Sequence, residues 1–302
     1  MLEKSEDFDW HGLFEEFCVS IIMAERAGAA DSPLVDLPEL QSDHIHDING
    51  FPVLLHHPMV LFGDGGSAKS YLALWVATKL AETSRIVLYL DWEFTGEEHR
   101  DRLKRLTGEP MPRSIRYLRC ERPITEESER IRRLIREQQV SYVICDSVAF
   151  AVGGAPEKSE MALGYFAVVR QFGIGSLHIA HVNKSEHGDQ RPFGSTFWHN
   201  SARSTWFLQR ATDTAGDTEV HLAAYHRKAN TGRLLPALGF RLSFEPTRTI
   251  VSRQDVNAGG SEELSGKLPV WQRMKATIQA LGPTTPALIA EEIGSSVETV
   301  GR

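Results

Sequence analysis

The stretch HHPMVLFGDGGSAKSYLALWVATKLAETSRIVLYLDWE, residues 56–93, sets a glycine-rich segment between an apolar run and a helical pattern. Residues 59–62 are typical of a short buried strand, 69–82 of a helix, and 85–91 of a second strand. A strand, a glycine-rich loop and a helix in this order direct backbone N–H groups toward one point, where the helix dipole favours an anion. The stretch therefore predicts a phosphate-binding loop in an α/β domain.

The residue types in this loop suit a nucleoside triphosphate. Glycines allow unusual dihedral angles and a close approach of the ligand. Lys69 is placed for the β- and γ-phosphates of ATP, and the Ser70 hydroxyl for Mg²⁺. The usual pattern has glycine directly before the lysine, whereas this chain has Ala68, whose methyl group is expected to reduce the freedom of the loop. The predicted nucleotide-binding residues are Gly63, Asp64, Gly65, Gly66, Ser67, Ala68, Lys69 and Ser70.

Acidic residues follow two other apolar strands. Asp146 ends the strand in YVICDS and is predicted to hold Mg²⁺ through water. Glu93 follows the strand of residues 85–91 and is predicted to polarise a water for attack on the γ-phosphorus, with Asp91 as the alternative. Ligands gather at the carboxyl ends of parallel strands, and Lys69, Glu93, Asp146 and His181 all fall at such ends.

Strands and helices alternate through the middle of the chain. Near-continuous apolar strands between helices predict a mostly parallel sheet covered on both faces, and residues 204–245 are expected to continue it as antiparallel hairpins. An amphipathic helix is expected at residues 9–28, with Leu13, Phe14, Phe17 and Ile21 at helical spacing. The predicted division is an N-terminal helical segment (1–44), an ATPase domain (45–250), a flexible linker (251–266) and a partial helix-turn-helix (267–302).

Composition limits the class of protein. The chain has 302 residues, a formal charge of −7 and three widely spaced cysteines. The negative charge argues against a general nucleic-acid binder, so any nucleic-acid contact is expected to be local. The cysteines show neither metal-ligand spacing nor a disulfide framework, which favours a reducing, cytoplasmic location. No signal peptide and no membrane-spanning apolar run are expected.

The order GDGGSAKS, VLYLDWE, YVICDS, LHIAHVNK and RPFGSTFWHNSARSTW resembles that of the RecA-like P-loop ATPases over residues 45–245. It looks closest to the AAA-25 branch, which includes the plasmid-encoded RepA-type hexameric replicative helicases. The resemblance implies a RecA-like α/β fold and Mg²⁺-dependent ATP hydrolysis. It also implies assembly into a homo-oligomeric ring, a hexamer in these relatives.

The resemblance also assigns roles. The glutamate after the second strand is the water-activating base, which maps onto Glu93. A polar γ-phosphate sensor ends the fourth strand; this maps onto His181, with His178 as the alternative on the opposite face. An arginine that reaches the neighbouring subunit's site maps onto Arg203, with Arg210 and Arg227 as rivals.

The segment HRKANTG resembles the Lys-x-Arg hairpin of related hexameric helicases. Asn230 stands in the place of the arginine, so Lys228 alone is kept as a candidate γ-phosphate sensor acting across the interface.

In RecA-like rings, the loops after the third and fourth strands of the sheet face the central channel and bind single strands. Here they are AVGGAPEKSE and NKSEHGDQRPFG, which carry Lys158, Lys184 and Arg191. A positively charged channel needs few such residues per subunit because a ring multiplies them. The alternative is that these are solvated loops with scattered charge.

The C-terminal TTPALIAEEIGSSVETVGR resembles a helix-turn-helix of the winged-helix kind, with Gly294 at its turn. A plain helical hairpin is the alternative. Because the second helix is cut short at Arg302, the core of this segment is expected to be incomplete.

Together these observations predict a ring-forming ATPase that acts as a replicative helicase or translocase on single-stranded DNA. Three other functions fit the same motifs. They are an ATP-switched recombination or repair mediator, a DNA-binding regulator whose ATPase domain gates dimerisation, and a nucleotide-binding scaffold that does not hydrolyse ATP.

Overall fold

A computed structural model describes residues 9–27, 31–39, 44–182, 192, 194, 196–212, 218–230, 232–256 and 262–301. The chain divides into two units, Met1–Ser42 and Asp43–Arg302. The first unit contains helix α1 (Trp10–Ala27), as predicted, and the short 3-10 helix η1 (Leu34–Asp36). Phe14 and Phe17 of α1 are exposed, so the apolar residues predicted for this helix do not form a core within it.

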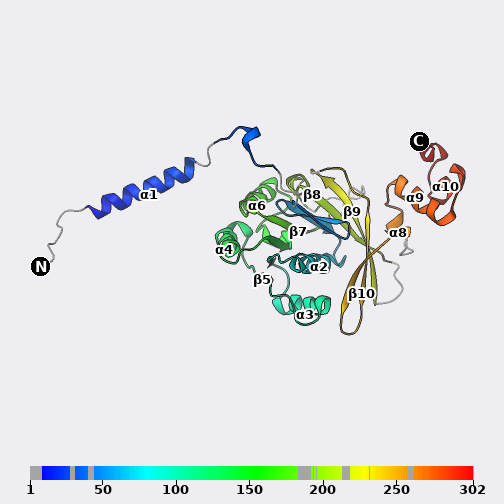
Figure 1. Cartoon of the computed structure of the whole chain (residues 1–302), viewed down its shortest axis with the longest axis horizontal. Helices are drawn as coiled ribbons and strands as arrows, with labels where there is room; N and C mark the ends of the chain where they lie inside the picture. Colours follow the sequence, from blue (N-terminus) through cyan, green and yellow to red (C-terminus); the bar gives the residue numbers. More distant parts are fainter. Residues whose placement is uncertain are drawn as a thin grey trace. The chain divides into compact units, whose positions relative to one another are not determined.

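The second unit is built on one large sheet (Figure 1). Among the described residues it has nine strands, in the order β11-β10-β9-β8-β3-β7-β6-β4-β5. The six strands from β8 to β5 are parallel, and β9, β10 and β11 continue the sheet as antiparallel neighbours. Their bounds are β3 (Pro58–Gly63), β4 (Val87–Asp91), β5 (Ile115–Arg119), β6 (Tyr142–Asp146), β7 (Gly175–His181), β8 (Ser204–Arg210), β9 (Glu219–Ala229), β10 (Leu238–Phe244) and β11 (Thr249–Gln254).

Helices cover both faces of this sheet, which is why most residues of its central strands are apolar. All residues of β3, β4 and β6 are buried. One face packs against α2 (Lys69–Glu82) and α3 (Gly96–Thr107). The other packs against α4 (Ile124–Glu137), α6 (Ser159–Gln171) and the short α7 (Phe197–Ser201), and α5 (Val148–Ala151) follows β6. The predicted mostly parallel α/β fold is confirmed.

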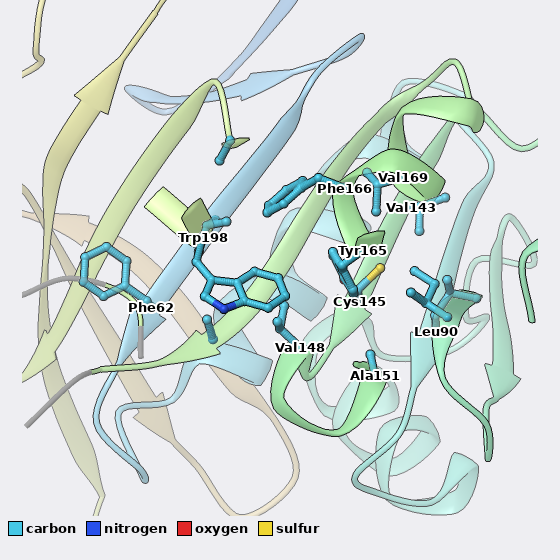
Figure 2. Packing of buried hydrophobic residues seen from close by; sticks show 14 of the residues in the cluster. Phe62, Leu90, Val143, Cys145, Val148, Ala151, Tyr165, Phe166, Val169 and Trp198 are labelled. Atoms are coloured by element: carbon cyan, nitrogen blue, oxygen red, sulfur yellow. The ribbon is translucent and has the colours of Figure 1, made fainter. Parts of the chain in front are cut away.

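The second face has an aromatic centre (Figure 2). Trp198 of α7 lies with its ring centroid 5.3 Å from that of Tyr165 and 5.7 Å from that of Phe166, both on α6. Cys145 and Val143 of β6 lie beneath them in the same cluster. This packing fixes the carboxyl ends of β6 and β7, where polar residues follow.

Two features at the margins of the sheet were not predicted. A hairpin of β1 (Ile45–Ile48) and β2 (Phe51–Leu54) precedes β3, and the Phe51 ring packs 5.0 Å from that of Trp206. Strand β11 pairs with β10 and extends to Gln254, into the segment predicted as linker.

The C-terminal residues form α8 (Glu262–Ser265), α9 (Val270–Leu281), α10 (Pro286–Glu292) and α11 (Val297–Val300). Ile289, Ile293 and Val300 share a small core with Met274 of α9, although this core was expected to be incomplete. Gly294 has a φ of 59° between α10 and α11, as the predicted turn requires. In the described part of the chain, each helix is too short or too polar to cross a bilayer.

Candidate nucleotide-binding site

The glycine-rich loop lies between the end of β3 and the start of α2, as predicted. At Gly63 a side chain would collide with the backbone carbonyl of Leu208 on β8, so glycine is required there. Gly66 has a φ of 75°, which favours glycine. Ala68 has a φ of 60° and a ψ of 25°, the left-handed conformation that explains why the usual pattern has glycine before the lysine.

Lys69 lies under this loop. It is 6% exposed, and its Nζ donates to the carbonyls of Gly63 at 3.0 Å and Asp64 at 2.7 Å. Burial lowers the pKa of Lys69, while the charges of Asp146, Glu93 and Asp64 raise it again. The ammonium group thus lies where an anion held by the loop would be neutralised.

A cavity of about 510 Å³ opens above the loop. Its volume is typical of small-molecule sites. It brings together the predicted Lys69, Ser70, Glu93, Asp146 and His181, which come from four different segments of the sequence. The remaining lining residues are Gly65, Gly66, Ser67, Ala68, Tyr71, Phe94, Arg102, Ile179, Arg210, Val220 and Phe244.

Asp146 has the environment of a metal ligand. It is 1% exposed; its Oδ2 accepts from the Tyr89 hydroxyl at 2.7 Å, and its Oδ1 has no hydrogen-bond partner among the described residues. Burial raises the pKa of Asp146, and the neighbouring Ser70 and Tyr89 hydroxyls oppose this shift. An acceptor oxygen without a partner at the phosphate loop fits a Mg²⁺ ion.

The described residues contain no group of three or more histidine, cysteine or acidic side chains that could hold a metal. Mg²⁺ usually keeps several waters and takes one or two protein ligands together with substrate phosphates. Asp146 and Ser70 are therefore the residues that would hold it here.

Asp91 and Glu93 have different surroundings. Asp91 is fully buried, and its Oδ1 accepts from the backbone N–H of Glu93 at 2.9 Å and of Phe94 at 3.0 Å. Its Oδ2 accepts from the Tyr117 hydroxyl at 3.0 Å and lies 3.5 Å from Nε2 of His99. Glu93 is exposed and lines the cavity, so Asp91 holds the backbone while Glu93 faces the ligand space.

The two histidines of β7 lie on opposite faces, as the alternation of the strand predicts. His178 is fully buried, with Nδ1 2.7 Å from the Tyr165 hydroxyl and Nε2 2.8 Å from the Ser176 hydroxyl. His181 lines the cavity, and its Cα pairs with that of Gly63. Burial and the charge of Lys69 lower the pKa of His181.

Arg203 lies at the opposite end of the strands from Lys69. It precedes β8, and its backbone N–H donates to the carbonyl of Pro58, at the start of β3. Since β3 ends at Gly63, the two positions are separated along the strand by roughly 16 Å. Arg203 is exposed and does not line the cavity of its own chain.

Lys228 lies near Arg203. Its Nζ donates to the carbonyls of His199, Asn200 and Ala202 at 3.0, 2.6 and 2.7 Å, at the end of α7. Burial lowers the pKa of Lys228, and the charge of Arg203 lowers it further. In this structure Lys228 thus caps a helix, and it does not line the cavity of its own chain.

Two arginines of the cavity were not assigned to it from the sequence. Arg210, considered as a rival to Arg203, ends β8 beside the loop and donates to the Gly66 carbonyl at 3.4 Å. Arg102 of α3 lies over the rings of Phe94 and Tyr71, at 4.6 and 5.2 Å from their centroids. The other rival to Arg203, Arg227, lies over the rings of Phe207 on β8 and Tyr225 on β9. Arg210 reaches this site because the order of strands puts the end of β8 beside β3, which the sequence alone did not indicate.

The two loops predicted to contact DNA adjoin each other. A Cβ at Gly194 of the second loop would collide with the carbonyl oxygen of Pro156 in the first loop. Nε1 of Trp198, which follows the second loop, donates to the same carbonyl at 2.9 Å, and Val182 bridges to Pro192. Lys158 is exposed at the start of α6. Lys184 and Arg191 lie outside the described residues.

Comparison with known proteins shows what the chain as a whole resembles. Residues 48–187 match the AAA-25 model of the AAA domain family. No curated protein matches the chain. Among solved structures, the chain is similar to a KaiC-like protein from the hyperthermophilic archaeon Pyrococcus horikoshii OT3, with a TM-score of 0.50 and 13% identity over 70% of this chain and 94% of that one. The likeness shows a RecA-like, KaiC-type fold, and with the AAA match it supports a P-loop ATPase domain.

Proposed function

We propose that this chain is a Mg²⁺-dependent ATPase that assembles into a hexameric ring and acts as a replicative DNA helicase, moving on single-stranded DNA. The observation that carries the ATPase is the convergence of Lys69, Glu93, Asp146 and His181 on one cavity above the glycine-rich loop. These residues come from the ends of β3, β4, β6 and β7, where ligands of open parallel sheets bind.

Each residue has a defined part in hydrolysis. Backbone N–H groups of residues 63–70 and the Lys69 ammonium hold the β- and γ-phosphates. When bound, Mg²⁺ would be held by Ser70 and Asp146 and would neutralise the negative charge of the phosphates. Glu93 takes a proton from the attacking water as the new oxygen–phosphorus bond forms and the bond to the ADP oxygen breaks. His181 hydrogen-bonds the γ-phosphate.

The role proposed for Arg203 depends on assembly into a ring. The exposed Arg203 lies at the far end of the strands from its own loop, so it serves only the site of a neighbouring copy. There its guanidinium neutralises charge that develops on the transferred phosphoryl group. Lys228 is its neighbour and the second candidate for the same interface.

The DNA-binding part of the proposal is supported by the position of two loops. The loop that follows β6 carries Lys158 and lies beside the segment at Pro192 and Trp198, which leads from β7 to β8. Both emerge at the carboxyl edge of the sheet, where the ATP cavity opens, so a strand bound there would sense the state of the nucleotide.

The test is ATP turnover with and without single-stranded DNA, at protein concentrations that span assembly. Turnover per chain is expected to rise with concentration and again with DNA. Turnover independent of both would contradict the ring and the DNA substrate. Strand displacement on forked DNA then separates a helicase from a mediator, which would bind DNA without unwinding it.

A further inference from the structure

A second cavity, of about 430 Å³, lies between α3, β5 and the segment that joins them. Its volume falls in the range of small-molecule sites. Aromatic rings form its inner wall and arginines stand at its rim. The residues on which the argument depends are Tyr89, His99, Tyr117, Arg100, Glu109 and Arg113.

The inner wall contains a buried polar group that needs a partner. His99 is 4% exposed, and its ring centroid lies 4.6 Å from that of Tyr89 and 5.9 Å from that of Tyr117. Neither ring nitrogen of His99 has a hydrogen-bond partner among the described residues, although Nε2 lies 3.5 Å from Oδ2 of Asp91. A buried polar atom without a partner is costly, so a ligand that supplies one is favoured.

The rim carries an excess of positive charge. Arg100 and Arg113 are exposed there. The acid of the rim, Glu109, is already paired with Lys104 at 3.0 Å, and that contact lowers the pKa of Glu109. Aromatic walls suit a planar molecule, and the two guanidinium groups at the rim suit a carboxylate.

Both aromatic walls reach the nucleotide site through single hydrogen bonds. The Tyr89 hydroxyl donates to Oδ2 of Asp146, and the Tyr117 hydroxyl donates to Oδ2 of Asp91, which holds the backbone of Glu93. A molecule that presses on these two rings therefore shifts the residues proposed to hold Mg²⁺ and to activate water, without touching ATP.

We propose that this cavity binds a small planar aromatic carboxylate and that its occupancy alters the turnover of ATP. The binding step stands on the cavity alone, whereas the effect on turnover rests on the proposed ATPase.

The experiment is calorimetric titration of the full chain, without nucleotide, with 2-naphthoate as the probe. One saturable site is expected. The Arg113→Ala variant and the uncharged probe 2-naphthamide are expected to bind roughly fivefold to tenfold more weakly, because a charge-assisted contact is lost. Arg116→Ala is the matched control. Arg116 is exposed on β5 between two residues that line the cavity, so it lies on the other side of the strand. Its loss is expected to leave binding of the probe unchanged.

Absence of saturable binding, or equal binding by the Arg113→Ala and Arg116→Ala variants, would overturn the site. Displacement of the probe by ATP would also overturn it, because the probe would then occupy the phosphate loop. With binding established, saturating 2-naphthoate is expected to change kcat for ATP with KM unchanged. Probe binding in a chain that does not hydrolyse ATP would contradict the proposed function but leave the cavity assignment standing.

Discussion

The Oδ1 atom of Asp91 accepts the backbone N–H of Glu93 at 2.9 Å, so a fully buried acid holds the exposed acid two residues further along. Further contacts hold Asp91 itself. Tyr117 donates to its Oδ2 at 3.0 Å, and Arg119 lies 3.6 Å from the same atom. The position of Glu93 therefore depends on a group that does not line the cavity.

Replacing Asp91 by asparagine is expected to lower kcat roughly tenfold to a hundredfold while KM for ATP stays within about twofold, because the base is displaced but the phosphate loop is intact. Steady-state kinetics measure both constants. Glu127→Gln is the matched control: Glu127 is 2% exposed and is paired with Arg130 at 3.3 Å on α4, away from the cavity. Equal losses of kcat in the two variants would show that Asp91 acts only on stability.

The left-handed conformation of Ala68 predicts a stabilising substitution. Ala68→Gly is expected to raise the free energy of unfolding by roughly 0.5–1 kcal/mol, since the strain of alanine at a φ of 60° exceeds the extra freedom of glycine in the unfolded chain. Thermal denaturation without nucleotide measures the effect. Ala77→Gly, in the interior of α2, is expected to destabilise by about 1 kcal/mol or more. A lower midpoint for Ala68→Gly would contradict the assigned backbone.

The buried His178 predicts a dependence of stability on pH. Burial lowers its pKa to about 3, so between pH 6.5 and 3 the unfolded chain binds a proton that the folded chain does not. Stability is therefore lost as the pH falls through this window, by about 1.4 kcal/mol per pH unit from this group. His178→Gln is expected to reduce the loss between pH 7 and pH 5 in denaturant titrations. His11→Gln is the control, because His11 is exposed on α1, and an equal slope in both variants would refute the assignment.

The separation of Arg203 from Lys69 predicts complementation between inactive chains. Lys69→Ala and Arg203→Ala are each expected to lose most ATP turnover, and a mixture of the two is expected to recover part of it. Mixed rings contain interfaces at which an intact Lys69 meets an intact Arg203 from the neighbour. Turnover of the mixture relative to the separate variants is the measurement.

Arg210→Ala supplies the control for this experiment. Arg210 lies beside the loop of its own chain, so every site in a mixture with Lys69→Ala still lacks one of the two residues. No recovery is expected. Recovery with Arg210→Ala, or none with Arg203→Ala, would contradict a site shared between neighbouring chains.

Elements that are marked by a pattern within one segment of the sequence were predicted. The glycine-rich loop, helix α2 and the apolar strands β4 and β6 each follow from the periodicity or residue types of one segment. The positions of Glu93, Asp146 and His181 at strand ends then predicted their convergence, because parallel strands share one edge.

What the sequence did not predict depends on contacts between distant segments. The end of strand β11 was assigned to a linker because the residues from 252 onward are rich in glycine, serine and acids, and its pairing with β10 makes it a strand. Arg210 lines the cavity because β8 lies beside β3. The order of strands in the sheet cannot be predicted from the pattern of any one segment. The small C-terminal core likewise needs Met274 of α9 to cover Ile289 of α10.

The central claim is that the loop of residues 63–70 binds the triphosphate of ATP through Lys69. The most direct test is to measure ATP affinity and turnover in Lys69→Ala and in the control Lys79→Ala. Lys79 is a partly exposed lysine of the same helix, paired only with Glu82 among the described contacts. Turnover by Lys69→Ala is expected to fall by about a hundredfold or more, because one charged contact in a buried site is lost. Lys79→Ala is expected to match the parent. Equal turnover in Lys69→Ala and the parent would contradict the claim.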